Sequence, residues 1–95
     1  KGLKFRDDPN VWTDLGVMYR RNGEPEKAIE SFQKAYAITP THEMSRLNEG
    51  IVRLYDLNDK EGAVQAWEEL LKINPLSVAA NGTPIDQLIK ELSEK

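Results

Sequence analysis

Apolar positions recur along most of the chain at steps of three and four, the spacing that places side chains on one face of an α-helix. Four segments carry this pattern, with polar residues between the apolar ones, so we predict four amphipathic helices. The residues that define their apolar faces are Trp12, Leu15, Gly16 and Tyr19; Ala28, Phe32, Ala35 and Tyr36; Leu47, Ile51 and Leu54; and Ala63, Trp67, Leu70 and Leu71.

The pattern also repeats when the chain is shifted by 35 residues against itself. The positions that then coincide include Ala28 and Ala63, Phe32 and Trp67, Pro40 and Pro75, Trp12 and Leu47, Val17 and Val52, and Tyr19 and Leu54. We therefore expect two copies of one unit, each a pair of helices.

Capping residues and short connections mark the expected helix ends. Asp8 before Pro9 is a typical cap for the first helix, and Gly23 supplies a left-handed residue at its end. Thr41 is expected to cap the third helix, and Asn58 begins a capping-box sequence for the fourth. Because the connections are only a few residues long, successive helices should be antiparallel neighbours.

A last amphipathic segment begins at Thr83-Pro84, a typical cap and proline start. Its apolar stripe consists of Ile85, Leu88, Ile89 and Leu92. A helix with one apolar face and a charged back can close the exposed core at the end of an array of repeats. Lying on a membrane surface is the alternative, which the mixed charge of its polar face disfavours.

Eight residues of the first unit occur with the spacing of the tetratricopeptide repeat signature, so the chain resembles that family. They are Trp12, Leu15, Gly16, Tyr19, Ala28, Phe32, Ala35 and Pro40. The second unit is a degenerate copy that retains Ala63, an aromatic residue at Trp67, and Pro75, while its small residue, Gly50, stands one position early. The resemblance implies an all-α solenoid of antiparallel helix pairs, with two repeats and a C-terminal capping helix.

The expected organisation has four parts. Residues 1–8 are the remnant of a preceding helix or a linker, residues 9–42 the first repeat, residues 43–77 the second repeat, and residues 78–95 a loop with the capping helix. Two repeats are few for a stable array. We therefore expect either a chain cut from a longer array or an open end that is hidden by self-association.

A second resemblance concerns the runs at residues 14–21 and 81–88, which look like the C-terminal tails of bacterial membrane-anchored cell-envelope tetratricopeptide proteins. If the natural N-terminus is such an anchor, a periplasmic or cell-envelope location is implied, and otherwise a cytoplasmic one. The fragment itself has no apolar run long enough for direct membrane insertion.

Composition argues against several kinds of chemistry. Lys and Arg number 13 and Asp and Glu 16, so the formal net charge is −3, which argues against phosphate-driven nucleic-acid binding. The chain has no cysteine and one histidine, His42, so no second histidine or cysteine exists to build a metal site or an activated nucleophile. Asp7, Asp8 and Asp14 suggest a divalent-ion site as an alternative, but a helix cap in a solvated acidic stretch is the favoured interpretation. We predict a protein that is not an enzyme and that has no cofactor and no metal.

Stacked helix pairs curve, and the first helix of each pair lines the concave side. With Trp12 and Tyr19 turned to the core, the candidate groove residues are Asn10, Thr13, Val17, Arg20, Arg21, Ser45, Asn48, Val52 and Tyr55. This mixed surface suits an extended or helical peptide, with Arg20 and Tyr55 as anchors. The alternative is that Arg20 and Arg21 only solvate a helix end and favour its dipole.

One ligand type is not expected. Tetratricopeptide domains of heat-shock co-chaperones bind acidic C-terminal peptides with a clamp of Lys, Asn and Arg, and the corresponding positions here are Thr13, Val17, Asn48 and Val52. The prediction is a protein-interaction module, a scaffold or assembly factor, whose partner is a protein or peptide of unknown identity. The alternative is a structural module that forms a homo-oligomer or anchors a larger complex.

Overall fold

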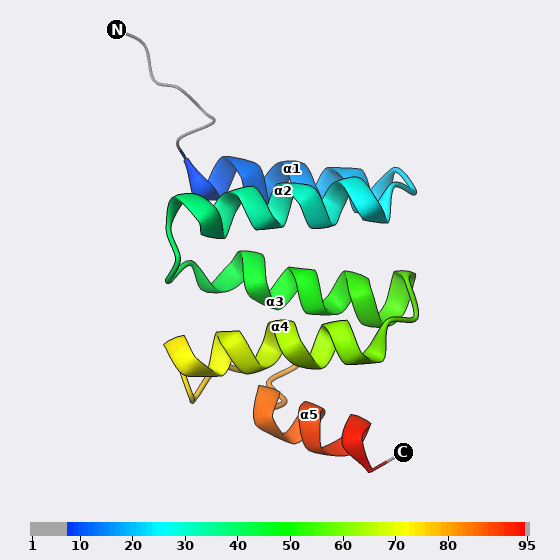
Figure 1. Cartoon of the computed structure of the whole chain (residues 1–95), viewed down its shortest axis with the longest axis vertical. Coiled ribbons are helices and arrows are strands. Elements are labelled where there is room, and N and C mark those ends of the chain that lie inside the picture. Colours follow the sequence, from blue (N-terminus) through cyan, green and yellow to red (C-terminus); the bar gives the residue numbers. More distant parts are fainter. Residues whose placement is uncertain (1–7, 95) are drawn as a thin grey trace, which may run out of the picture.

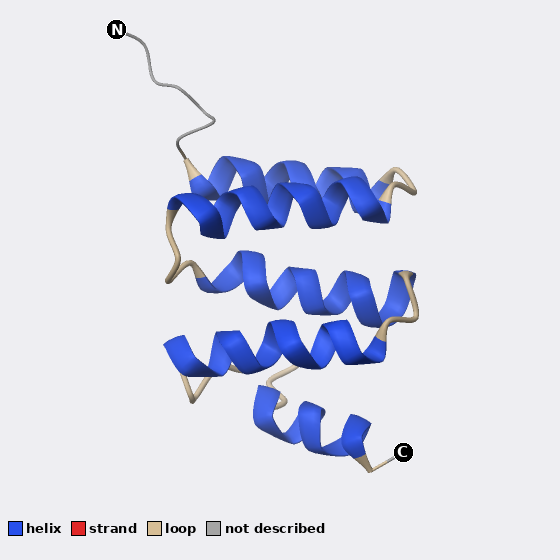
Figure 2. Cartoon of the chain, viewed as in Figure 1, coloured by secondary structure: helices blue, strands red, loops and turns tan. Residues whose placement is uncertain are grey.

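The computed structural model describes residues 8–94, and the expected remnant helix or linker at residues 1–8 lies almost entirely outside them. The helices are α1 (Pro9–Arg21), α2 (Pro25–Ile38), α3 (Glu43–Ile51), α4 (Lys60–Ile73) and α5 (Ile85–Ser93). A π-helical turn, Val52–Asp56, continues α3 directly and is called the π-turn below. Figures 1 and 2 show the first four helices stacked side by side, with the shorter α5 below α4.

The stack is an array of antiparallel helix pairs. α1 packs along α2, α3 lies between α2 and α4, and α5 packs on α4 (Figure 1). The predicted all-α helix-pair architecture with a closing C-terminal helix is therefore confirmed. Two hydrophobic clusters run through the stack, one centred on Phe32 and Val52 and the other on Trp67, Leu70 and Ile85.

The residues of the repeat signature have different degrees of burial. The side chains of Phe32 and Trp67 are 0% and 1% exposed, as the paired aromatic positions predicted. The small residues Gly16, Ala28, Ala35 and Ala63 are also buried. Trp12, Leu15 and Tyr19 are half-buried, while the helix-ending Pro40 and Pro75 are exposed. The second helix of each pair therefore supplies most of the core.

Two helix ends match the expected signals. The Asp8 side chain accepts a hydrogen bond of 2.9 Å from the Asn10 backbone N–H, which confirms Asp8 as the cap of α1. After α1 the chain turns at Gly23, whose φ of 77° lies in the left-handed region that glycine adopts at no steric penalty.

Three other expected caps were wrong by one residue. His42, and not Thr41, caps α3, because its ring accepts from the Ser45 N–H. Asp59, and not Asn58, caps α4, because Asn58 itself adopts a left-handed φ of 54°. α5 begins after Pro84, and not after Thr83.

The late start of α5 has a local cause. Val78 and Pro84 form an antiparallel bridge, and the Ile85 N–H donates to the Ser77 carbonyl at 3.0 Å. This pairing holds Pro84 in an extended conformation with ψ of 140°, so that the helical residues begin at Ile85. The same turn directs the chain back toward the end of the stack, where α5 covers Trp67 and Leu70.

Each helix pair contains the same kind of close contact, a glycine of its first helix against an aromatic ring of its second. A methyl group added at Gly16 would overlap the Phe32 ring, and one added at Gly50 would overlap the Trp67 indole. The glycines are 34 residues apart, whereas the aromatic residues are 35 apart. The second pair therefore contains one extra residue between Gly50 and Trp67, which explains why Gly50 stands one position early in the 35-residue alignment.

The π-turn accommodates this extra residue. Its hydrogen bond runs from the Leu57 N–H to the Val52 carbonyl, five residues back, which is the pattern of one residue inserted into an α-helix. At the end of α1 the Glu24 N–H donates to the Tyr19 carbonyl, five residues before it. The corresponding bond after the π-turn runs from the Asp59 N–H to the Arg53 carbonyl, six residues before it. Within α3, equivalent positions are thus separated by 34 residues, and after the π-turn by 35.

Candidate functional site

A small hollow lies between α1 and α3, the first helices of the two pairs. Its volume is about 180 Å³, and its walls come from Val17, Arg20, Arg21, Phe32, Asn48, Ile51 and Val52. Five of these seven are among the nine residues predicted to line the groove. The structure therefore brings together side chains from two helices that the sequence placed on one side of the array.

Three predicted groove residues are buried. Thr13 is 6% exposed, Ser45 is 0% exposed, and Val52 is 1% exposed within the Phe32 cluster. The Thr13 hydroxyl donates to the Pro9 carbonyl at 2.7 Å, and the Ser45 hydroxyl donates to the His42 carbonyl at 3.2 Å. The polar atoms of Thr13 and Ser45 are thus satisfied within the fold, whereas Val52 contributes to the wall of the hollow. Whether any of the three contacts a ligand stays a prediction.

The extra residue changes which positions of α3 are equivalent to those of α1. With the 34-residue spacing of the glycines, the equivalent of Val17 is Ile51, and not Val52 as the 35-residue shift implied. Ile51 and Val17 line the same hollow, and Val52, which also lines it, packs in the Phe32 cluster. By the same 34-residue spacing, the equivalent of Asn10 is Met44, and not Ser45. The early position of Gly50 was the sequence signal that could have corrected both.

The exposed side of α3 continues into the π-turn. Asn48, Ile51 and Tyr55 follow at steps of three and four, and Tyr55 is 67% exposed. Ile51 lines the hollow toward α1 and also a hollow toward α5 that Tyr55 shares. We call this side of α1, α3 and the π-turn, with Val17, Arg21, Asn48, Ile51 and Tyr55, the groove surface.

The two arginines at the end of α1 differ in their partners. Arg20 Nε lies 2.6 Å from Asp56 Oδ2, so Arg20 ties the end of α1 to the π-turn in a partly exposed ion pair. Arg21 forms no ion pair with any residue between 8 and 94. Arg21 is therefore better placed than Arg20 to pair with an acidic group of a partner. The ion pair joins residues 36 positions apart and left no signal in the sequence.

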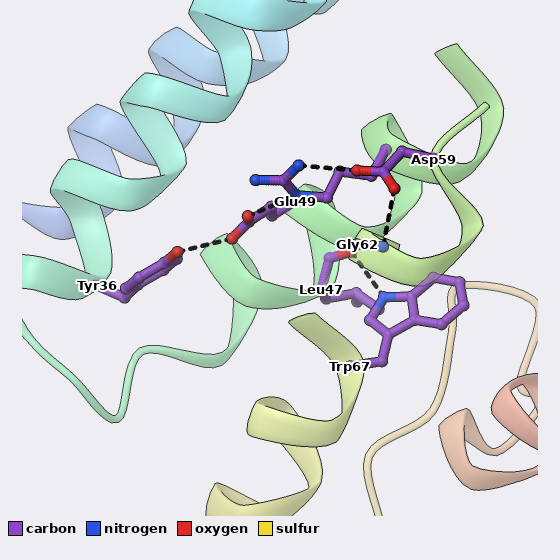
Figure 3. Close-up of polar contacts among 7 residues, drawn as sticks. Tyr36, Leu47, Glu49, Asp59, Gly62 and Trp67 are labelled. Carbon is purple, nitrogen blue, oxygen red and sulfur yellow. Dashed lines mark hydrogen bonds and ion pairs between the residues drawn. The ribbon is translucent and has the colours of Figure 1, made fainter. Parts of the chain in front are cut away.

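A charged network holds the π-turn against its neighbours (Figure 3). The buried Glu49 carboxylate accepts from the Tyr36 hydroxyl at 2.8 Å and from Arg53 Nε at 2.8 Å. Arg53 also donates to Asp59 at 3.1 Å, and Asp59 caps α4 by accepting from the Gly62 N–H at 2.9 Å. The network therefore connects α2, α3, the π-turn and the start of α4.

Two pKa values reflect this network. Burial and the hydrogen bond to the Glu49 carboxylate raise the pKa of Tyr36 to about 12, so Tyr36 is a hydrogen-bond donor at neutral pH. Burial opposes the charge of Arg53, but the bonds to Glu49 and Asp59 outweigh burial and raise the pKa of Arg53 above its usual value. Both effects favour a fixed arrangement of donors around one carboxylate.

His42 and Asn10 join the starts of α3 and α1. His42 Nδ1 accepts from the Ser45 N–H at 3.3 Å, so the ring proton is assigned to Nε2, which lies 2.8 Å from the Asn10 side-chain oxygen. Burial lowers the pKa of His42, and the nearby Asp8 carboxylate opposes this shift. Asn10 thus supports the histidine and lines none of the hollows described here.

The groups that the groove surface offers to a partner are an arginine, an amide, a phenol and two aliphatic side chains. Between residues 8 and 94, no helix is long and apolar enough to cross a membrane. In the same part of the chain, no three acidic or histidine side chains are grouped closely enough to hold a metal ion.

Comparison with known proteins identifies the first helix pair. Residues 9–42 match the tetratricopeptide repeat family. The chain is also 32% identical to peroxisomal targeting signal receptors of Candida glabrata and Eremothecium gossypii, over 73 residues that make up 77% of its length. The matched regions make up 12% and 13% of those proteins, so the chain spans about an eighth of their length. Both relatives are fungal and lend no support to the bacterial cell-envelope resemblance, which stays a prediction.

Proposed function

Since residues 9–42 belong to the tetratricopeptide repeat family and the described chain is an array of antiparallel helix pairs, we propose that it is a non-catalytic protein-interaction module. In this proposal a peptide or protein partner binds to the groove surface, and the module serves as a scaffold or assembly factor. Recognition needs no cofactor, since hydrogen bonds, apolar contacts and ion pairs to fixed side chains supply the affinity.

The observation that carries the proposal is the hollow between α1 and α3. It combines the aliphatic surface of Val17 and Ile51 with two groups that can recognise a peptide, the Arg21 guanidinium and the Asn48 amide. An asparagine side chain both donates and accepts, so it can pair with the backbone of an extended peptide. A hollow of this size, with both aliphatic and polar groups in its wall, can hold a single side chain of a bound peptide.

The curated relatives support a peptide as the type of partner. Their name describes receptors for a targeting signal. Because this chain corresponds to only 12–13% of their length, the proposal takes from them only the general class, a segment of another protein.

Self-association is the second candidate function, and one observation favours it. An open, mainly apolar hollow of about 460 Å³ lies at the end of the array formed by α1, lined in part by Leu15, Met18 and Tyr19. Met18 is 63% exposed there. A second copy could cover this surface, and sedimentation over a range of concentrations distinguishes a monomer from a dimer.

The test of the first candidate is selection of peptides from a random library on the immobilised chain, followed by titration of the best binder. We expect Asn48→Ala and Arg21→Ala each to weaken binding by about fivefold to thirtyfold, or about 1–2 kcal/mol. The matched control is Lys60→Ala, which removes an exposed charge from the start of α4 and should leave the affinity unchanged. Equal loss in all three variants would contradict a site between α1 and α3.

A further inference from the structure

Two adjacent hollows lie on the other flank of α3, between it and α5. Their volumes are about 240 and 220 Å³, and they share Tyr55, Trp67 and Leu88. The first is completed by Leu47, Ile51 and residues 79–81, and the second by Leu54, Glu91 and Leu92. Aliphatic and aromatic side chains thus make up most of both walls, so these hollows suit apolar groups.

Tyr55 lies at the boundary of the two hollows. The π-turn carries this side chain, which is 67% exposed, and the ring lines both hollows. An exposed tyrosine beside apolar hollows offers a large rigid surface with one polar group, the kind of residue that dominates binding energies at interfaces.

Trp67 gives both hollows an apolar wall. Its side chain is 1% exposed, and its indole N–H donates to the Leu47 carbonyl at 3.2 Å (Figure 3). The one polar atom of the ring is therefore already satisfied within the fold. A group that enters either hollow meets only the apolar part of the indole, which again favours apolar side chains as occupants.

The charges along the surface distinguish its two ends. Glu91 is the one charged side chain among the residues that line the two hollows next to α5, and its carboxylate accepts from Gln87. The described part of the chain from Ile85 onward carries Asp86, Glu91 and Glu94 against Lys90. The hollow next to α1 is instead lined by Arg20 and Arg21. Since Ile51 lines a hollow on each flank of α3, one surface has a basic end and an acidic end.

From this arrangement we infer that the hollows beside Tyr55 bind two apolar side chains of a peptide segment that carries lysine or arginine next to them. The basic residue pairs with Glu91, and the net negative charge of residues 85–94 favours this end of the peptide over α5. The inference rests on the proposed function, to which it adds the chemistry of the partner and its direction along the groove surface.

Fluorescent synthetic peptides test the charge preference. Each carries two leucines at varied spacing, flanked by lysines, glutamates or serines, and is titrated against the whole chain by fluorescence anisotropy. We expect the best lysine peptide to bind about tenfold more tightly than its glutamate counterpart, a ratio that shrinks as salt is raised. Glu91→Lys should reduce or reverse the preference. Glu94→Lys makes the same charge change at a residue that lines neither hollow, and should leave the ratio within about twofold.

Two further measurements locate the site. Tyr55→Ala should weaken the lysine peptide about tenfold or more, whereas Met18→Ala, an equally exposed truncation on α1, should not. In NMR spectra of the chain, the lysine peptide should shift the Trp67 indole N–H resonance and leave that of Trp12 in place. Both truncations are at exposed positions, and circular dichroism spectra check that each variant is folded.

The possible results separate this inference from the proposed function. If the peptides shift Arg21 and Asn48 but not Trp67, the inference is wrong and the groove function stands. Equal binding of lysine and glutamate peptides, equal effects of Glu91→Lys and Glu94→Lys, or no binding by any of these probes also overturns the inference. The groove function is wrong as well if the library-selected peptides, too, leave Arg21, Asn48 and Tyr55 unaffected.

Discussion

The two helix pairs have the same kind of internal contact, but the residues next to that contact differ. In both, a glycine of the first helix lies against an aromatic ring of the second, Gly16 against Phe32 and Gly50 against Trp67. At the positions equivalent to Leu15 and Tyr19, counted at the 34-residue spacing of the glycines, the second pair has Glu49 and Arg53. The close approach of two helices thus tolerates a change from apolar to charged surroundings.

The difference also changes what the surface can do. The second pair has one residue more than the first, and the π-turn that contains it carries Tyr55 between two hollows and Asp56 to within reach of Arg20. In the first pair, α1 ends without a π-turn, and the chain turns at the left-handed Gly23. The π-turn that contains the inserted residue therefore supplies both Asp56, for the ion pair that connects the repeats, and Tyr55, the exposed aromatic residue of the groove surface.

The largest expected effect tests whether the two contacts are equivalent. Phe32→Ala and Trp67→Ala each remove a fully buried ring, so each should reduce the free energy of unfolding by about 3–5 kcal/mol. Urea titrations followed by circular dichroism measure both. Leu76→Ala, at a side chain that is 85% exposed, is the control and should cost less than about 0.5 kcal/mol. If only one ring matters, the pairs are not equivalent.

The next effect tests the charged network of the second pair. Glu49→Gln removes the charge that Arg53 and Tyr36 share, and should cost about 1–3 kcal/mol, since Arg53 keeps some contact with water. In the triple variant, Glu49→Leu and Arg53→Tyr give the second pair the residues of the first, Leu15 and Tyr19, and Tyr36→Phe removes the hydroxyl that would lose its acceptor. This variant should be close to wild type or more stable.

Urea titrations compare the two variants. A triple variant that is less stable than Glu49→Gln would mean that the π-turn needs the network itself, and not merely the absence of unpaired buried groups.

A smaller effect concerns the turns at the ends of the two first helices. Gly23 and Asn58 have φ values of 77° and 54°, and nothing lies within 4 Å of a methyl group placed at Gly23. Gly23→Ala and Asn58→Ala should therefore each cost about 1–2 kcal/mol for conformation alone, while Asn58→Gly should stay within about 0.5 kcal/mol of wild type. Thermal unfolding of the three variants checks this, and a neutral Gly23→Ala would show that this turn differs from the described one.

The smallest effect is a dependence on pH from His42. Its folded-state pKa lies below the ordinary value of 6.5, because burial disfavours the charged ring by more than the nearby Asp8 carboxylate favours it. As the pH falls through 6.5 the unfolded chain binds a proton first, so this contribution to stability is complete above pH 6.5 and decreases as the pH approaches the folded-state value. The midpoint of urea unfolding of the wild-type protein should therefore fall as the pH is lowered through this range.

His42→Asn is the matched control, since asparagine caps helices well and does not titrate. It should show a weaker fall in the same pH range. Equal slopes in the two proteins would assign the pH dependence to other groups.

The sequence predicted the helices well because their apolar spacing is regular and most of their ends carry capping residues. The groove residues of α3 were harder to predict. Within α3 the repeat spacing is 34 residues and not 35, and one residue corresponds to about 100° of helix rotation, so Val52 was paired with Val17 although Ile51 is its equivalent. The hollows next to α5 had no local signal, since they depend on the bridge between Val78 and Pro84 that positions α5.

Amide hydrogen exchange, with and without a library-selected peptide at saturation, tests most directly whether the first helices carry the binding surface. We expect the bound peptide to slow exchange in residues 17–21 and 48–57, around the hollows on either side of α3, and to leave the exposed side of α2 near Glu30 and of α4 near Glu68 unchanged. Protection confined to α2 and α4, with none around Asn48 and Tyr55, would contradict a groove surface formed by α1, α3 and the π-turn.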